Sequence, residues 1–341
     1  MSRTISQESI AQAVGVSKNA VSLALAGKPG VSEKTRQRVV QVAEQLGYSK
    51  PEIAPRRKAR RAQAQTIGIV VRETFLQETL FFGPLLAFIQ HQVAALGMNT
   101  LVHALSPEEE EAVQMPDWLD SQNLSGLLTI SKISTKFLDA LSRHLPMVLV
   151  DHYDPLVACD AVLTANMVGG FVATHHLITL NHDHIGFMGL ITSDGAPSNY
   201  ERAAGYQMAL TTNPRCTGPE MCLLASETDS VTLSKQLDDL STMPTAWFCA
   251  NDVVAFHLVR CLRDRGVDVP NDVSVVGFDD LQLATVSEPP LTTLRVDPNL
   301  FARRAVDRLV WRMNHPDVAV EHLSIRPTFI SRESTRARQP S

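Results

Sequence analysis

The sequence lacks the features that would place it in a membrane, outside the cell or among disulfide-rich proteins. It contains no apolar run of the ~18–20 residues that a membrane span requires. Its first residues are polar and include no apolar signal segment. Its five cysteines are odd in number, scattered and without a CxxC pair, which indicates thiols buried in a reducing compartment. We therefore expect a cytoplasmic protein without a membrane partner.

Catalytic and cofactor motifs are also missing. The sequence contains no GxSxG, HExxH or P-loop pattern, and no nucleophile or acid/base pair stands out. The histidines between residues 175 and 184 resemble a metal cluster, but no cysteine joins them. A turn at Asn181 with surface histidines explains this pattern better, and Glu108–Glu111 is typical of a solvated helix start. We expect no enzyme activity, no cofactor and no metal.

What the sequence does have is a strong asymmetry of charge. Residues 1–61 contain 12 Lys+Arg and 4 Asp+Glu, a net charge of +8, whereas the remaining residues contain 19 and 32, a net charge of −13. The length of 341 residues predicts two or three domains, and 44% hydrophobic residues are typical of globular proteins. A basic N-terminal segment on an acidic body indicates nucleic-acid binding by that segment alone.

The basic segment also contains the pattern of a helix-turn-helix. Gly15 can adopt the left-handed backbone conformation that ends a helix, and Ser17 can cap the helix that follows it. That second helix, from about Lys18 to Leu25, places polar side chains on one side and apolar ones on the other. A third helix is expected after Ser32. A second helix of this kind fits the major groove of DNA.

From Thr66 onward, strand-like apolar runs alternate with helical segments, which predicts parallel sheets covered by helices on both faces. There are too many strands for one compact sheet, so we expect two subdomains. The predicted strands are 67–71, 100–105, 124–130, 147–150, 161–164, 185–190, 245–250 and 273–278. The predicted helices are 84–96, 135–144, 167–180, 200–211 and 253–265, with another beginning at Asp297-Pro298. Ligands bind at the carboxyl ends of such strands.

Several motifs, in the expected order, resemble the lactose/galactose repressor (LacI/GalR) family of bacterial transcription regulators along nearly the whole chain. They lie at residues 10–17, 31–36, 46–48, 200–206, 249–252, 269–280 and 290–294. The resemblance implies an N-terminal all-α helix-turn-helix headpiece and an α/β periplasmic-binding-protein-like core of two parallel-sheet subdomains. It also implies a homodimer that binds double-stranded operator DNA, and a small-molecule effector, often a sugar.

The same resemblance divides the chain into three parts. Residues 1–49 would be the DNA-binding domain, residues 50–65 a basic hinge or linker, and residues 66–341 the effector-binding and dimerisation core. Within the core, the N-subdomain would take about 66–165 and 296–325, and the C-subdomain about 166–295 and 326–341.

The linker departs from the family pattern. Relatives form a hinge helix that inserts a leucine into the minor groove, but here Arg57 takes that position, beside Pro55. An arginine in a narrow minor groove is one interpretation, and a disordered tether is the other.

The family's DNA-contacting positions fall on a small set of residues. Lys18, Asn19 and Leu23 correspond to base-contacting positions, since Asn can pair with adenine and Lys with guanine. Leu23 stands where many relatives have Arg, so it either contacts a thymine methyl group or packs in the core. The positions that correspond to phosphate contacts are Ser6, Ser17, Ser22, Ser32 and Thr35.

The family's effector-binding positions give Asp151, Ser198, Arg202, Asn251 and Asp279. Carboxylates, amides and guanidinium groups form suitable hydrogen bonds with vicinal hydroxyls. Phe81 and Phe82 stand where the family has aromatic residues: one of them could stack on a sugar ring, and at least one is expected to pack in the core. Arg72 either meets an acidic effector group or forms an ion pair, and Asp280 is expected to be structural. We conclude that the chain is a sequence-specific transcriptional regulator, a repressor under effector control; the alternatives are a solute-binding sensor without repressor activity and an α/β enzyme.

Overall fold

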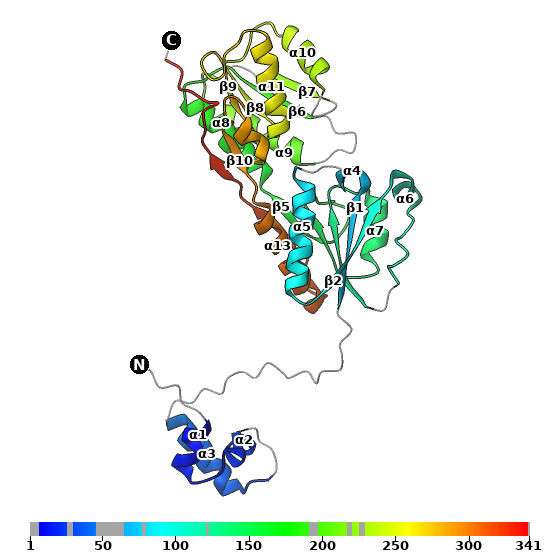
Figure 1. Cartoon of the computed structure of the whole chain (residues 1–341), viewed down its shortest axis with the longest axis vertical. Coiled ribbons are helices and arrows are strands. Elements are labelled where there is room, and N and C mark those ends of the chain that lie inside the picture. Colours follow the sequence, from blue (N-terminus) through cyan, green and yellow to red (C-terminus); the bar gives the residue numbers. More distant parts are fainter. Residues whose placement is uncertain are drawn as a thin grey trace. The chain divides into compact units, whose positions relative to one another are not determined.

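The computed structural model describes most of the chain, which forms two compact units. The units are residues 1–62 and 63–341 (Figure 1). The described residues are 7–25, 30–45, 65–76, 80–120, 123–190, 197–216, 220–224 and 229–339. Among them, no helix has the length and apolar composition needed to cross a membrane.

The described part of the first unit contains three short helices around a small apolar core. Ile10, Val21 and Val39, one from each helix, are fully buried at its centre. Helices this short are marginal in isolation, so their shared core stabilises them. They are α1 (Gln7–Val14), α2 (Lys18–Leu25) and α3 (Glu33–Gln45).

The second unit begins with the N-subdomain, whose described residues form a six-stranded parallel sheet in the order β11-β5-β4-β3-β1-β2. Helices α5 (Phe82–Ala95) and α13 (Pro298–Asn314) cover one face and α7 (Thr135–Ser142) covers the other (Figure 1). The strands are β1 (Thr66–Arg72), β2 (Asn99–Leu105), β3 (Leu124–Ile130), β4 (Met147–Val150), β5 (Asp160–Thr164) and β11 (His322–Ile325). Two shorter helices, α4 (Glu73–Leu76) and α6 (Pro107–Ala112), follow β1 and β2.

The C-subdomain is built on a second parallel sheet, with four strands among its described residues in the order β7-β6-β8-β9. Helices α8 (Asn166–Thr179) and α9 (Pro197–Leu210) pack on one face, and α10 (Ser230–Asp238) and α11 (Asp252–Asp264) pack on the other. The strands are β6 (Ile185–Leu190), β7 (Glu220–Leu224), β8 (Ala246–Cys249) and β9 (Ser274–Val276), and the short helix α12 (Gln282–Val286) follows β9.

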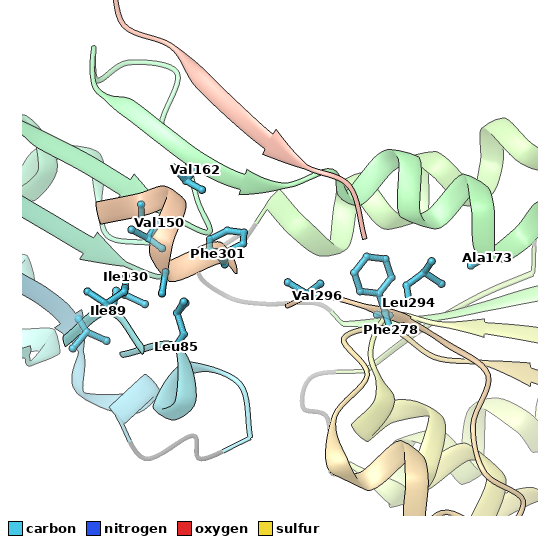
Figure 2. Close-up of a cluster of buried hydrophobic side chains, with 14 of the residues drawn as sticks. Leu85, Ile89, Ile130, Val150, Val162, Ala173, Phe278, Leu294, Val296 and Phe301 are labelled. Carbon is cyan, nitrogen blue, oxygen red and sulfur yellow. The ribbon is translucent and has the colours of Figure 1, made fainter. Parts of the chain in front are cut away.

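The chain crosses between the two subdomains three times among the described residues: after β5, after β10 (Thr293–Arg295) and before β12 (Thr328–Ile330). β10 and β12 pair in the antiparallel direction, which joins two of these crossings. Figure 2 shows Val296 between the buried side chains of the N-subdomain, such as Phe301, and those of the C-subdomain, such as Phe278. The apolar core is therefore continuous across the crossovers.

The predicted fold class is confirmed. Every strand predicted from the sequence is present, with ends within two residues of those predicted, and the predicted helices are present as well. The sequence interpretation missed β7, β10, β11, β12, α4, α10 and α12. The expectation that Glu108–Glu111 is solvated was wrong in part, because Glu110 is buried.

Candidate functional site

The second helix of the headpiece presents polar side chains on an exposed face. Lys18, Asn19 and Ser22 are exposed on α2, whereas Val21 on the same helix is buried. Leu23 is half-buried. Its Cδ1 atom lies close to Gly30, where an added Cβ atom would be 3.2 Å away. Leu23 therefore packs in part against the loop before α3 and leaves part of its surface accessible.

The predicted turn and caps of the headpiece are present. Gly15 has a φ of 74° and lies between α1 and α2. The Ser17 hydroxyl accepts a hydrogen bond from the Ala20 N–H at 3.2 Å, and the Ser32 hydroxyl accepts one from the Thr35 N–H at 3.2 Å. In the free protein these two hydroxyls cap helices. That they contact phosphate in a DNA complex stays a prediction. Ser6 and Arg57, also predicted to contact DNA, lie outside the described residues.

A cavity of about 310 Å³ lies between the two subdomains, at the carboxyl ends of their strands. All of the predicted effector-binding residues except Arg72 line it, together with residues that the sequence interpretation did not select. The predicted residues in its wall are Phe81, Phe82, Asp151, Ser198, Arg202, Asn251 and Asp279; the others are Thr74, Phe75, Ser131, Lys132, His152, Leu190, Pro197, Asn199, Val253 and Leu281.

Arg202, on α9, is a buried cation in this wall. Its Nη1 donates to the Ala250 carbonyl at 2.6 Å, its Nε to Asn166 Oδ1 at 2.9 Å, and its Nη2 to Asp279 Oδ1 at 3.2 Å. Its guanidinium carbon also lies 3.8 Å from the centre of the Phe278 ring. These contacts fix the guanidinium in one orientation beside the cavity, because each of them holds a different atom or face of the group.

Two carboxylates lie near this arginine, and both have a left-handed backbone. Asp151 follows β4 with a φ of 63°, and Asp279 follows β9 with a φ of 98°. Loss of hydration raises the pKa of Asp151 to about 7; Arg202 lowers this pKa, whereas Asp279 raises it. Positive φ is uncommon for residues other than glycine and concentrates at functional sites. The pair therefore presents hydrogen-bond acceptors from both subdomains to one space.

Asn251 and Phe81 contribute to the cavity from the ends of helices. The Asn251 side chain accepts a hydrogen bond from the Val254 N–H at 2.9 Å and so caps α11. Phe81 precedes α5 and packs edge-on against Phe82, with ring centroids 5.2 Å apart, and Phe82 packs in the same way against Phe75 at 4.6 Å. These three phenylalanine rings form an apolar part of the cavity wall, in contrast to the charged part formed by Arg202 and Asp279.

Comparison with known proteins agrees with this geometry. Residues 8–51 match the family described as "Bacterial regulatory proteins, lacI family", and residues 174–335 match a periplasmic binding protein-like domain. The HTH-type transcriptional repressor PurR of Haemophilus influenzae (strain PittEE) is 28% identical over 96% of this chain and 98% of that protein. The chain therefore combines a lacI-family helix-turn-helix domain with a periplasmic-binding-protein-like domain. It is a DNA-binding transcriptional regulator.

Two further similar proteins cover nearly the whole chain. The ribose operon repressor of Haemophilus influenzae (strain ATCC 51907 / DSM 11121 / KW20 / Rd) is 28% identical over 95% of this chain and 97% of its own. The crystal structure of the lac repressor dimer bound to operator and the anti-inducer ONPF superimposes with a TM-score of 0.70 at 25% identity, over 98% of this chain and 100% of that one. Headpiece and core are therefore both matched in one continuous comparison.

The position of Arg72 corrects one expectation about this regulator. Its Nε and Nη2 atoms donate to the two carboxylate oxygens of Glu110 at 2.7 and 2.8 Å, and Glu110 also accepts from the Ser134 N–H at 2.6 Å. Burial by itself would raise the pKa of Glu110, but these hydrogen bonds outweigh it and lower the pKa. The ion pair is formed, and Arg72 does not line the cavity between the subdomains.

Two further expectations concern residues outside the cavity. Asn181 has the left-handed φ of 65° expected of its turn, but His182 is buried rather than on the surface. Its ring nitrogens lie 3.0 Å from the hydroxyls of Thr245 and Ser274. Asp280 is structural, as expected, because Arg295 and Arg332 both donate to it. Within the described residues, no group of three His, Cys, Asp or Glu side chains could hold a metal ion.

Sequence interpretation missed several cavity residues that one of its own rules could have found. Ser131 directly follows β3, and His152 lies two residues after β4. The rule that ligands bind at the carboxyl ends of parallel strands selects both positions. The sequence interpretation instead selected Asp151, because it is charged and corresponds to a family effector-binding position.

Proposed function

We propose that this regulator is a repressor whose affinity for operator DNA changes when a small polyhydroxylated effector, such as a sugar, occupies the cavity between the subdomains. The observation that carries the proposal is the arrangement of Arg202 and Asp279 beside Asp151 in the wall of that cavity. In this proposal residues 1–49 bind DNA, and residues 66–341 bind the effector and form a homodimer.

The cavity wall suits a neutral polyol. Carboxylates accept hydrogen bonds from hydroxyls, and a guanidinium donates to them, so adjacent groups of both kinds can bind two neighbouring hydroxyls of one ligand. The Phe81 and Phe82 rings offer apolar surface to the C–H face of a sugar ring. A concave site with an apolar wall and a few placed polar groups is the usual form of a small-molecule site. The name of the ribose operon repressor, a relative, supports the same class of ligand.

Control of DNA binding follows from linkage. The cavity is lined by both subdomains, so a ligand that contacts both stabilises the relative arrangement that it fits best. If that arrangement has a different affinity for operator in the dimer, the ligand and the operator each change the affinity for the other by the same factor. Coupling of this kind is typically about 5- to 150-fold.

The experiment begins by selecting a duplex from a random-sequence DNA pool with the full chain. Operator affinity is then measured by fluorescence anisotropy with and without neutral sugars, sugar phosphates and nucleosides, and the same compounds are screened for an increase in Tm. We expect a neutral sugar to raise the Tm and to change the operator affinity at least about fivefold.

A matched pair of variants links the effect to the cavity. R202M removes the guanidinium from its wall and is expected to abolish the sugar response, whereas R303M, on the exposed face of α13, should leave the response unchanged. Sugar binding without sequence-dependent DNA binding would support a solute sensor instead and would refute the proposed function.

A further inference from the structure

Two buried polar atoms in the N-subdomain wall of the cavity have no hydrogen-bond partner among the described residues. Ser131 is 2% exposed and His152 is 1% exposed, and both line the cavity. Neither Ser131 Oγ nor His152 Nε2 has a hydrogen-bond partner among the residues that the structure describes. Buried polar atoms are nearly always hydrogen-bonded, so two orphaned atoms in one cavity wall indicate a group that arrives from outside the chain.

The two residues are held together by one carbonyl group. The Val150 oxygen lies 3.2 Å from the Ser131 backbone nitrogen, which donates to it, and 3.1 Å from His152 Nδ1. A carbonyl can only accept, so Nδ1 carries the proton of the imidazole and Nε2 presents a lone pair. Burial lowers the pKa of His152 to about 4. The ring is therefore neutral at physiological pH, and Nε2 is an acceptor that requires a donor.

The backbone of Ser131 adds a second energetic cost at the same position. Ser131 has a left-handed φ of 68°, which is uncommon for residues other than glycine. Strained backbone and an unpaired buried hydroxyl both reduce the stability of the free protein, and such costs collect at functional sites. A ligand hydroxyl that reached this wall would pair both orphaned atoms at once.

We propose that Ser131 and His152 form a polar subsite that determines effector specificity, in which a hydroxyl of a neutral sugar donates a hydrogen bond to His152 Nε2 and accepts one from Ser131 Oγ. This inference rests on the proposed function, because it names the group of the effector that the cavity recognises. The Ser131–His152 subsite, in the N-subdomain, gives the effector a second point of attachment besides the charged pair of Arg202 and Asp279 in the C-subdomain.

The chemistry of the subsite favours a hydroxyl over a phosphate. A phosphate monoester has lost most of its protons at pH 7, since its second pKa is about 6, and so has little to donate to Nε2. Asp279 lines the same cavity, as does Asp151, which is partly ionised at pH 7 because its pKa is about 7, and both repel a second negative charge. Lys132 also lines the cavity and attracts anions, so sugar phosphates form a separate arm of the test.

The test compares S131A, H152L and H152Q with the wild-type chain. Thr129 provides a matched control, because its hydroxyl is also buried without a partner among the described residues but does not line the cavity. For each variant, Tm is measured without ligand, and Kd is measured by calorimetry for the aldopentoses, aldohexoses and glucose disaccharides that raise the wild-type Tm, for their monodeoxy analogues and for their phosphates.

We expect S131A to leave the Tm of the free protein unchanged or raised, because it removes an unpaired buried hydroxyl. The same variant and H152L should each weaken sugar binding about 3- to 10-fold, the loss of one neutral hydrogen bond. H152Q should restore part of the affinity, and T129V should leave it unchanged. One monodeoxy sugar should bind the wild type weakly, and H152L should no longer distinguish it from the parent sugar.

The outcomes separate this inference from the proposed function. If sugars bind wild type and H152L with equal Kd and equal preference over every deoxy analogue, the subsite is refuted and the proposed function stands. A fall in the Tm of free S131A would assign the hydroxyl a structural partner and would also refute the subsite. If only sugar phosphates bind, the hydroxyl assignment is wrong. If no sugar or sugar phosphate binds, the proposed effector class fails with it.

Discussion

Asp252 shows how a single buried carboxyl group connects the cavity wall to the crossover between the subdomains. It is fully buried at the start of α11; its Oδ1 accepts from the Thr293 hydroxyl at 2.6 Å and its Oδ2 from the Leu281 N–H at 2.8 Å. Thr293 belongs to crossover strand β10, and Leu281 lines the cavity. Burial, opposed by these hydrogen bonds and reinforced by the charge of Asp279, raises the pKa of Asp252 to about 8.

This pKa predicts a pH dependence of stability. An unfolded Asp has a pKa near 3.8, so between about pH 4 and 8 the folded chain keeps a proton that the unfolded chain releases. The free energy of unfolding therefore falls as pH rises through this window, by about 1.4 kcal/mol per pH unit for this one group. In D252N, which cannot titrate but retains an acceptor and a donor, denaturant unfolding at pH 5, 6 and 7 should show a slope smaller by that amount.

A control on the same helix tests the assignment. Asp264 is exposed near the end of α11, so D264N should reproduce the wild-type slope. Asp151, with a pKa of about 7, contributes a similar slope up to that pH, which should persist in both variants. Equal slopes for D252N and the wild type would show that Asp252 is ionised in the folded chain.

At the scale of elements, the crossing of α8 and α9 determines where Arg202 lies. A Cβ atom at Gly205 would lie 2.1 Å from the Met167 carbonyl oxygen, and one at Gly170 would lie 2.2 Å from the Arg202 carbonyl oxygen. The helix backbones therefore touch at both glycines. Asn166, at the start of α8, holds the Arg202 guanidinium from the neighbouring helix. Close helix packing and orientation of the cavity cation are parts of one arrangement.

We predict that G205A separates these helices and displaces Arg202. The added methyl group should destabilise the chain by about 1–3 kcal/mol, as overpacking does. It should also weaken sugar binding about tenfold or more, since the guanidinium no longer meets Asp279. Tm and calorimetric Kd measure the two effects.

A substitution in the core that is remote from the cavity distinguishes the effect on stability from the effect on sugar binding. L237A removes a buried side chain on α10 that does not line the cavity, and it should lower stability by about 2–5 kcal/mol without a change in Kd. If G205A reduced Tm but kept the wild-type Kd, the helix crossing would have no part in positioning Arg202.

Strand β11 illustrates an element that local sequence does not predict. Its side chains are exposed or half-exposed, so it lacks the apolar run that identified the other strands of this sheet. It lies beside β5 in parallel register. Asp160, on β5, accepts from the Glu321 N–H at 2.8 Å and from Arg308 and Arg312 on α13. The strand forms because a buried carboxylate about 160 residues earlier in the chain holds its start.

At the scale of the whole molecule, charge is divided between the two ends of the chain. The net charge of +8 in residues 1–61 contrasts with −13 in the remainder, so the acidic body should repel DNA while the basic segment binds it. We predict that operator affinity falls about 10³- to 10⁵-fold between 50 and 200 mM salt, as expected for 6–10 phosphate contacts. Fluorescence anisotropy across this salt range measures the slope.

A substitution at a base-contacting residue should change the sequence specificity of DNA binding without changing its salt dependence. N19A removes an exposed amide of α2 and should relax the preference at one base pair by about 1–3 kcal/mol while keeping the salt slope. Q37A, at an exposed position on α3, should change neither quantity. A uniform loss of affinity for all sequences in N19A would show that Asn19 contacts phosphate rather than a base.

The sequence by itself determined those features whose causes lie within a few residues. The caps at Ser17 and Ser32, the turn at Gly15 and the strand and helix segments of the core depend on local hydrogen bonds and on the period of apolar side chains, so they could be predicted. Family motifs added the residues of the cavity wall that lie inside well-matched segments, such as Arg202 and Asp279.

Only the tertiary structure decided which polar groups found partners. Arg72, at the end of β1, pairs with Glu110 on α6, and His182 is buried beneath the C-terminal segment at Arg336. Ser131 and His152 lie close together because β3 and β4 are neighbouring strands, and both residues contact the Val150 carbonyl group. Whether a polar side chain is satisfied, paired or left for a ligand depends on groups that are distant in sequence, because burial removes the water that would otherwise make every position equivalent.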